Sequence, residues 1–144
     1  MSEQQTYKNH VRWYPPFHFI LAPVLLLNVI FAIVQIVRDF NIDRVAYLIM
    51  AIGFVFLAVV ARAQALRAQD RVIRLEETLR YQKVLTSDLA DKANSLKTGQ
   101  MIALRFASDE ELPSLIERTL QGDFEKPDKI KREIKNWRGD FLRV

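Results

Sequence analysis

Two long apolar runs open the chain, and a mixed polar and apolar sequence follows them. The first run covers residues 17–37 and the second covers residues 45–61, and neither contains Asp, Glu, Lys or Arg. At ~1.5 Å per helical residue they reach about 31 and 26 Å, against a hydrocarbon core of ~30 Å. The pattern predicts two membrane-spanning helices, joined as an antiparallel hairpin by the connector 38–44. A buried core helix is the alternative for either run. A cleavable signal peptide fits the first run poorly, because the run is too long and no A-x-A site follows it.

The helical pattern continues beyond the second run without a break. Residues 62–84 contain no Gly or Pro and are rich in strong helix formers, so we expect one helix to extend to about residue 84 as a stalk. Apolar residues along it follow a 3-4 spacing: Ala65, Ala68, Val72, Leu75 and Leu79. This seam predicts either a short dimerising stalk or a stripe that packs on the chain's own C-terminal domain.

Residues 86–144 are predicted to form a small domain of four short helices. We expect helices over 88–96 and 99–107, a third that starts at the capping box Ser108-x-x-Glu111 and ends at Gly122, and a fourth from Pro127 to about Trp137. No segment alternates with period two, so no strand is predicted. The expected core is Leu89, Leu96, Ile102, Leu104, Phe106, Leu112, Leu115, Ile116, Leu120, Ile130, Ile134 and Trp137.

The predicted fold class is therefore an all-α membrane protein. It comprises an N-tail (1–16), a two-helix transmembrane hairpin (17–61), a helical stalk (62–84) and a small cytoplasmic helical domain (86–144). Within that domain we expect Trp137 on the last helix to act as the core anchor, together with Phe106 and Ile134, because a large aromatic side chain buries much of the area available to 59 residues.

Charge orients the hairpin. The flanks that share a side with the two termini, residues 1–16 and 62–81, carry seven Lys and Arg residues, whereas the connector carries two. The positive-inside rule then places both termini in the cytoplasm. Trp13, Tyr14 and Arg62 are predicted to anchor the hairpin at the membrane interface, where amphipathic rings and long basic side chains are favoured.

Polar residues within the first run suggest a contact between helices. Asn28 and Gln35 are seven residues apart and share a helix face, and Gly53 offers a small residue on the second run. Polar side chains in lipid tend to hydrogen-bond across helices. We therefore predict a helix–helix interface at Asn28, Gln35 and Gly53, inside the hairpin or with a partner. The alternative, a tolerated polar residue near the bilayer surface, suits Gln35 better than Asn28.

Three stretches carry a resemblance to a known family. They are Gln5-x-Tyr7-x-Asn9-His10-x-Arg12 with Pro16-Phe17-His18; Ile102 to Pro113 (IALRFASDEELP); and Ile130-Lys131 with Ile134-Lys135-Asn136-Trp137-Arg138 and Asp140. Together they resemble an uncharacterised bacterial family of two-span membrane proteins, known only as a domain of unknown function. The resemblance implies a bacterial inner (plasma) membrane protein and supplies no activity, cofactor or catalytic residue.

The composition offers little catalytic chemistry. The chain has no cysteine, which excludes disulfides, thiolate metal sites and a cysteine nucleophile, and its four glycines do not form a phosphate-binding loop. His10 and His18 have no neighbouring carboxylate cluster, and the run Asp109 to Glu111 suits the start of a helix. We therefore predict no enzyme, metal site, cofactor or small-molecule substrate.

A basic run near the C-terminus raises one further possibility. Lys131, Lys135 and Arg138 would share a face of the predicted last helix. Such a face raises a nucleic-acid hypothesis, but a solvated face or one turned toward anionic lipid is the favoured interpretation. Residues 62–144 carry 14 acidic residues beside 17 basic ones, which weakens the nucleic-acid interpretation. The leading hypothesis is a non-enzymatic inner-membrane accessory, scaffold or adaptor protein with a protein partner or a second copy of itself. A membrane-tethered nucleic-acid-binding regulator is the alternative.

Overall fold

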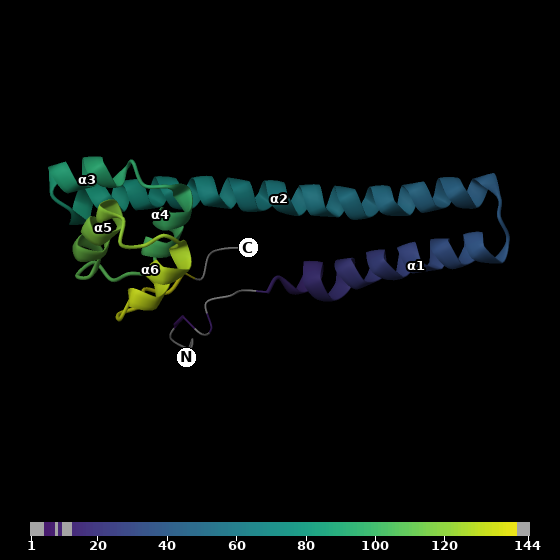
Figure 1. The fold of residues 1–144 in the computed structure, drawn as a ribbon, viewed down its shortest axis with the longest axis horizontal. Helices are drawn as coiled ribbons and strands as arrows, with labels where there is room; N and C mark the ends of the chain where they lie inside the picture. The colour runs from purple at the N-terminus through teal and green to yellow at the C-terminus, as the bar shows by residue number, and fades with distance from the viewer. Residues whose placement is uncertain (1–4, 8, 10–12, 141–144) are drawn as a thin grey trace. The chain divides into compact units, whose positions relative to one another are not determined.

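The computed structural model describes residues 5–7, 9 and 13–140, and all of the regular elements among these residues are helical (Figure 1). The chain divides into two compact units. The hairpin unit is Arg12–Leu66, and the C-terminal unit combines Met1–Val11 with Arg67–Val144. The predicted all-helical class is confirmed for the described residues.

The hairpin unit begins with a wide helical turn. η1 (Pro16–Leu21) is π-helical and leads directly into α1 (Ala22–Arg38), so that the pair forms one helical stretch of 23 residues. Pro23 stands at the start of α1. Because proline has no N–H and its ring crowds the preceding turn, the wider turn before it relieves that crowding. Pro23 thus marks the change from π to α geometry.

A tight connection joins α1 to α2 (Ile42–Val84). Asn41 caps the start of α2, since its side-chain oxygen accepts the Asp43 N–H at 2.8 Å. Arg44 reaches back to the end of α1, where it donates to the Gln35 carbonyl at 2.9 Å and pairs with Asp39 at 3.0 Å. A cation at this place also complements the negative end of the α1 dipole.

A hydrogen bond between side chains also joins the two helices within their apolar runs. Asn28 Nδ2 on α1 donates to the Tyr47 hydroxyl on α2 at 2.8 Å. Among the described residues of this unit, Ala32 and Ala51 are the buried ones. Small side chains at buried positions allow two helix backbones to approach each other. Gly53, by contrast, is exposed, and a methyl group added there would meet nothing within 4 Å.

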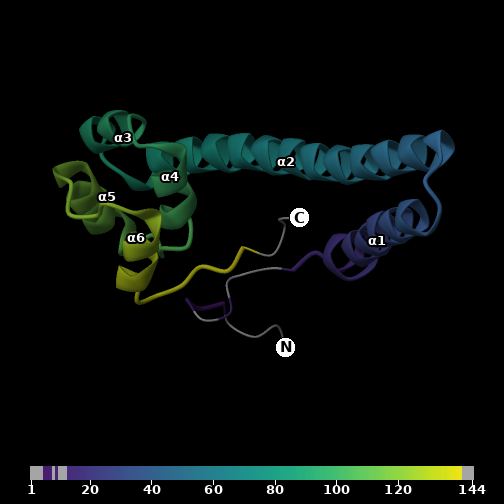
Figure 2. The same ribbon diagram turned by 45° about the vertical axis from the view of Figure 1, so that its right-hand side comes forward.

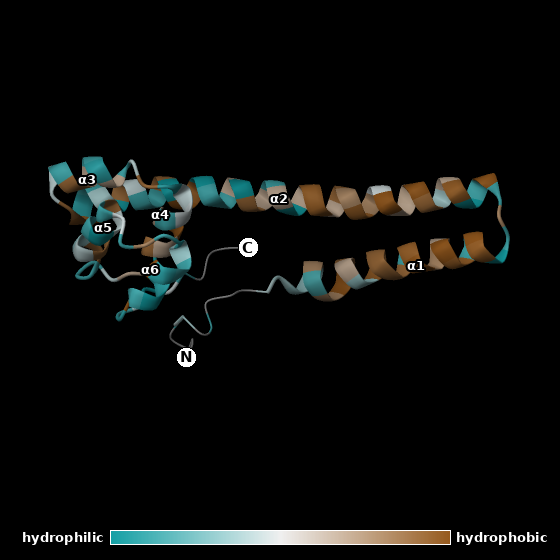
Figure 3. Cartoon of the chain, viewed as in Figure 1, coloured by the Kyte–Doolittle hydropathy of each residue, from teal (hydrophilic) through white to brown (hydrophobic). Residues whose placement is uncertain are grey.

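The α2 helix is 43 residues long and unbroken, as the absence of Gly and Pro after residue 61 predicted. Its surface changes along its length, from mostly apolar in the first half to mixed in the second (Figure 3). Both η1–α1 and α2 are long and apolar enough to cross a membrane, and only 6% of the apolar window of each is buried.

Four short helices gather around the last turns of α2 to form the C-terminal unit (Figure 2). They are α3 (Ser87–Ala93), α4 (Thr98–Leu104), α5 (Leu112–Gln121) and α6 (Pro127–Glu133). The largest fully buried side chains are Tyr81, Met101, Leu104, Phe106, Leu112, Ile116 and Ile130. Because Tyr81 belongs to α2, the core extends across the predicted boundary at residue 86.

The ends of α5 differ in how well the sequence predicted them. Gly122 ends α5 in the left-handed conformation, with φ of 90°, as predicted for a residue without a Cβ. The start is later than predicted, at Leu112. Ser108 Oγ does accept the Glu111 N–H at 3.4 Å, but the Glu111 carboxylate does not complete the capping box and binds a distant segment instead.

The last helix is also shorter than predicted, because α6 ends at Glu133 and Trp137 lies beyond it. Glu111 accepts the N–H groups of Lys135 and Asn136 at 3.0 and 2.7 Å. These N–H groups are the ones that would continue the helical ladder, so the carboxylate ends the helix. The segment then runs extended and forms an isolated antiparallel bridge between Ala107 and Trp137. The prediction that Trp137 lies on the last helix is wrong for this reason.

The Asn28–Tyr47 contact leads to a first prediction. Asn28→Leu and Tyr47→Phe remove the same hydrogen bond, so each should destabilise the protein by about 0.5–1.5 kcal/mol in mild detergent. The double variant should cost little more than either single variant, because the second change removes nothing further. Unfolding of the four proteins in a double-mutant cycle measures this coupling. Gly53→Ala, at an exposed position of the same unit, is the matched control and should not destabilise. Additive losses for the two single variants would contradict the contact.

Candidate functional site

The second and third stretches of the family resemblance meet in the C-terminal unit. Besides the bridge between Ala107 and Trp137, the Arg138 N–H donates to the Phe106 carbonyl at 2.7 Å. The loop between α4 and α5 therefore lies against the segment that follows α6, although about 30 residues separate the two along the chain. Backbone pairing of this kind fixes both segments without any requirement on the side chains.

The first stretch, in the N-tail, reaches the same segment from the other end of the chain. Gln5 is buried, and its side-chain oxygen accepts the Asp140 N–H at 2.8 Å. Tyr7 donates its hydroxyl to Asp128 at 2.8 Å, and its ring lies under the Arg132 guanidinium at 5.1 Å. Through Gln5 and Tyr7, these contacts join the N-tail to the second and third stretches in one region, which we call the junction.

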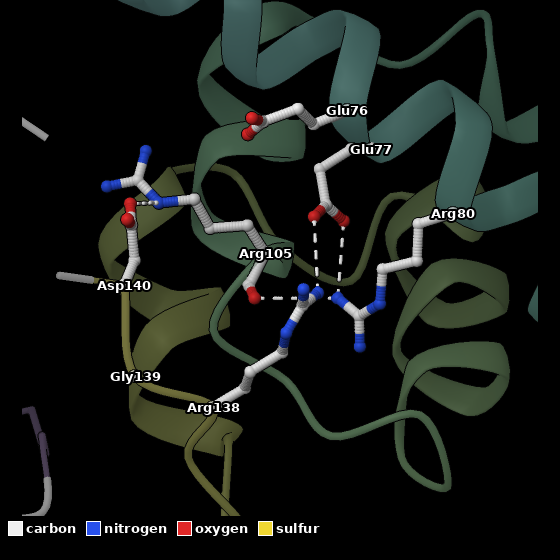
Figure 4. Close-up of a pocket in the computed structure, with 7 residues that line it drawn as sticks. All are labelled: Glu76, Glu77, Arg80, Arg105, Arg138, Gly139 and Asp140. Carbon is white, nitrogen blue, oxygen red and sulfur yellow. Dashed lines mark hydrogen bonds and ion pairs between the residues drawn. The ribbon is translucent and has the colours of Figure 1, made fainter. Parts of the chain in front are cut away.

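Arg80 of α2 is the central cation of the junction (Figure 4). Its side chain is only 9% exposed. The guanidinium donates through Nη2 to the Ala107 carbonyl at 2.7 Å, and through Nε and Nη2 to Asp109 at 2.8 and 2.6 Å. A planar guanidinium presents several donors in fixed directions, so one side chain holds both a carbonyl and a carboxylate of the α4–α5 loop.

Glu77 is the buried carboxylate of the junction. Its side chain is 5% exposed and lies 3.3 Å from Arg80 Nη1 and 3.8 Å from Arg138 Nη1. Burial raises the pKa of Glu77, and the attraction of the two guanidinium groups offsets this effect only in part. Burial of Glu77 therefore favours its protonated form.

Arg105 and Asp140 form a further ion pair of the junction. Arg105 Nε lies 3.0 Å from Asp140 Oδ2, and the Arg105 side chain is 6% exposed. The guanidinium also lies over the Phe106 ring at 4.5 Å from its centroid, which adds a cation–π contact. The Asp140 carboxylate therefore pairs with Arg105, and the Asp140 backbone N–H donates a hydrogen bond to the Gln5 side chain.

A pocket of about 590 Å³ lies among these groups (Figure 4). Its lining residues contribute three guanidinium groups and three carboxylates: Glu76, Glu77, Arg80, Arg105, Arg138, Gly139 and Asp140. Five of the six charged side chains pair within the lining, as the distances above show. The arrangement holds chain segments together, and its charges are balanced before any ligand arrives.

The profile of a family of unknown function, DUF6526, matches residues 1–144. The chain belongs to this family. Neither a curated protein nor a solved structure matches it. In this DUF6526 member, Gln5 and Tyr7 of the first stretch meet the second and third stretches at the junction.

The predicted core anchors of the DUF6526 chain lie together beside the junction. Phe106 and Ile134 are buried, and Trp137 is partly buried. The Phe106 and Trp137 rings are 5.1 Å apart, and Trp137 Nε1 donates to the Ile134 carbonyl at 3.1 Å. The indole N–H thus has the partner that a buried tryptophan needs.

The predicted interface anchors lie in the hairpin unit. Arg62 stands over the Tyr14 and Phe17 rings at 5.4 and 5.8 Å from their centroids. Trp13 is 60% exposed, and its ring meets His18 edge-on at 4.9 Å. The structure therefore gathers aromatic rings and a cation where the chain enters η1. The role of these residues at a membrane surface stays a prediction.

The remaining predicted residues have different outcomes. Asn28 contacts Tyr47 across the hairpin, whereas Gln35 is partly buried and contributes its backbone carbonyl to Arg44. Gly53 does not lie at the contact between α1 and α2, and its contact with a partner stays a prediction. Among the described residues no group of three His, Asp or Glu side chains is placed to hold a metal ion. His10 lies outside the described residues.

The basic run does not form the helical face that was predicted. Because α6 ends at Glu133, Lys135 and Arg138 do not continue the face of Lys131. Cations in and beside this run are also paired with carboxylates: Lys129 with Glu125, Arg132 with Asp128 and Arg138 with Glu77. A surface neutralised in this way attracts phosphate groups less strongly than free cations would.

Sequence reasoning missed the two charged residues at the centre of the junction. Glu77 and Arg80 lie in the stalk, where charge normally indicates a solvated face. A four-residue spacing of Ile73, Glu77 and Tyr81 was present in the sequence and marks the buried face of α2. Glu77 in the middle of that spacing made a buried face hard to recognise, because charged side chains are rarely buried unless they are paired.

Trp137 provides the second prediction. Trp137→Ala should lower the unfolding free energy by about 2 kcal/mol, below the ~3–5 kcal/mol of a fully buried tryptophan, because the side chain is only partly buried. Thermal or denaturant unfolding of the full chain measures the loss. Trp13→Phe is the matched control, since Trp13 is 60% exposed and should leave the transition unchanged. An unchanged midpoint for Trp137→Ala would show that its contact with Phe106 contributes little.

The raised pKa of Glu77 gives the third prediction. A carboxyl group whose pKa is higher in the folded state binds its proton more tightly there. Its stabilising contribution is complete below its ordinary pKa of 4.5 and is lost as the pH rises through the folded-state value. Lowering the pH from 7 toward 4.5 should therefore stabilise the wild type relative to Glu77→Gln, which carries no titrating proton.

Unfolding of both proteins along a pH series tests this sign. Taking the difference in unfolding free energy between the two proteins cancels the titration of the groups that both contain. These groups include Arg80, Arg105 and Arg138, which face Glu77. If pairing with these cations outweighed burial, the wild type would lose stability relative to the variant as the pH falls. That opposite slope would contradict the assignment.

Proposed function

We propose that this DUF6526 member is a non-enzymatic accessory, scaffold or adaptor protein of the bacterial inner membrane. In this proposal, η1–α1 and the apolar first half of α2 form a hairpin anchor. The C-terminal unit stands in the cytoplasm as the part that meets a protein partner or a second copy. The three elements of the proposal rest on separate observations.

The exposed apolar surface of the hairpin unit carries the proposal of a membrane anchor. Phe19, Leu27, Ile49 and Phe56 are each more than three-fifths exposed. Burying one such side chain is worth about 1.5–3 kcal/mol, so an entire helix surface of this kind is unstable in water. Hydrocarbon is the solvent that suits it, and the lengths of both helices agree with this.

The charge distribution supports the orientation. Seven Lys and Arg residues flank the hairpin on the side of the termini, and two lie in the connector. Arg62 at the end of the second apolar run stands over aromatic rings at the start of the first, as expected of residues at one membrane surface. Both termini are therefore proposed to be cytoplasmic.

The junction supports a structural role for the C-terminal unit. Its charged side chains bind one another and the backbone of three chain segments, so the pocket presents a balanced, paired set of charges. Such a set suits a rigid body that displays a surface to another protein. Binding of nucleic acid is the weaker alternative, because the basic run is interrupted and carboxylates pair with part of its charge.

Membrane retention is the fourth prediction. The full chain should stay with bacterial membranes through an alkaline carbonate wash, and Leu27→Arg should lower the fraction retained, because an arginine at the middle of a span costs about 2.5–3.5 kcal/mol. Leu75→Arg is the matched control. Leu75 is similarly exposed, at 62% against 65% for Leu27, but lies outside the apolar runs, so membrane retention should not change.

Reporter fusions test the orientation separately. A cytoplasmic reporter should be active at both termini, and a periplasmic reporter should be active only within the connector 38–44. A periplasmic signal at either terminus would overturn the hairpin. Complete release of the unmodified chain by carbonate would overturn the anchor itself.

A further inference from the structure

The second half of α2 carries an apolar stripe that the C-terminal unit leaves uncovered. We define the stalk stripe as Ala68, Val72, Leu75 and Leu79, all within the part of α2 that belongs to the C-terminal unit. All four are exposed, and the three larger side chains are 54%, 62% and 51% exposed in chain order. Of the two interpretations of the seam, packing on the chain's own domain is therefore not what the structure shows.

The C-terminal unit uses the opposite face of the same helix. Ile73, Glu77 and Tyr81 are the residues of this part of α2 that it buries. At 3.6 residues per turn their mean direction lies about 170° from that of the stalk stripe. A second helix can therefore approach the stripe without displacing the domain from its own face.

We propose that the stalk stripe pairs with the same stripe of a second copy of this chain, as a short parallel coiled coil. The 4-3-4 spacing places Val72 and Leu79 at a positions and Ala68 and Leu75 at d positions of a heptad. Leu75 and Leu79 would then pack across the pair as knobs into the holes of the opposite helix. A self-complementary stripe of this kind generates a closed, two-fold symmetric dimer.

The charged residues beside the stripe favour a second copy of the chain in parallel orientation as the partner. Arg71 occupies a g position and Glu76 the e position of the next heptad, and both side chains are exposed. In a parallel pair these two positions face each other, so Arg71 of each copy meets Glu76 of the other, twice over. An antiparallel pair would set Arg71 against Thr78 and would gain no ion pair.

Anchoring makes so short a coiled coil feasible. Two heptads alone are marginal in water because helix association must overcome ordering and dilution. Copies held in one membrane share an orientation and a high effective concentration, on the order of millimolar for short tethers. This orientation rests on the proposed membrane anchor, whereas the stripe and its charges do not.

Cysteine scanning tests the pairing directly, because the natural chain has no cysteine. Single variants Ala68→Cys, Val72→Cys, Leu75→Cys and Leu79→Cys, in full-length protein in native membranes, are oxidised and resolved on non-reducing gels. Each should form a homodimer several-fold more efficiently than Arg67→Cys and Arg74→Cys. The two control residues are exposed, lie on the same part of α2 and point away from the stripe.

Mixed expression tests the direction of the pair. When Ala68→Cys and Leu79→Cys chains of different size are produced together, cross-links should join like positions and not unlike ones. Cross-links between position 68 and position 79 would overturn the parallel arrangement. Equal cross-linking at stripe and control positions, no cross-linking at the stripe, or cross-links only to a different protein would overturn self-pairing.

Charge exchange tests the selection of a second copy. Arg71→Glu and Glu76→Arg should each reduce the Leu75→Cys cross-link by several-fold, because each sets like charges opposite one another, and the double exchange should restore it.

Leu75→Asp should abolish the dimer and leave the unfolding transition of the C-terminal unit in place, since the side chain is exposed there. If carbonate releases the chain but the stripe still cross-links, the anchor fails and the pairing stands. If the chain is retained without stripe cross-links, the pairing alone fails.

Discussion

The arrangement of the C-terminal unit depends on the hydrogen bonds and ion pairs of the buried Arg80 guanidinium. A cation that is 9% exposed has lost most of its hydration and must be matched by acceptors. The α4–α5 loop supplies two of its acceptors, the Ala107 carbonyl and the Asp109 carboxylate, and Glu77 of α2 supplies another. Once this loop is fixed against α2, its backbone can pair with the segment after α6, and that segment brings Asp140 to Arg105 and Gln5.

The charged network also explains how short helices adopt one arrangement. Helices α3, α4 and α6 have seven residues each and α5 has ten, lengths at which an isolated helix is marginal in water. Apolar burial holds them together but tolerates several packings of similar energy. Glu77 and Arg80 are satisfied only when the α4–α5 loop and Arg138 are in place, so other packings leave a buried charge unpaired.

The two faces of α2 in the C-terminal unit have separate roles in this account. One face, with Ile73, Glu77 and Tyr81, holds the domain, and the family stretches supply the groups that close it. The other face, with Leu75 and Leu79, is exposed, and it is the face proposed to pair with a second copy. The resemblance within the family thus describes how the C-terminal unit is closed on its helix, and the proposed partner surface lies on the side that those stretches do not reach.

Local chemistry made part of this structure predictable. The continuity of α2 to Val84 follows from a stretch without Gly or Pro, and the end of α5 at Gly122 follows from the ease with which glycine adopts positive φ. Both depend on residues within a turn or two of each other. Most of the expected core was also right, since apolar spacing marks a buried helix face whatever lies opposite.

The junction depends on contacts between groups that are distant along the chain. The local spacing of apolar and polar residues does not indicate such contacts. Glu111 ends α6 by accepting N–H groups 24 and 25 residues away, which removes Trp137 from the helix where periodicity placed it. Glu77 and Arg80 look like solvated stalk residues until the loop that neutralises Arg80 is in place. A charged residue can be buried only if its partners arrive with it, so its burial is a property of the folded chain and not of its neighbours in sequence.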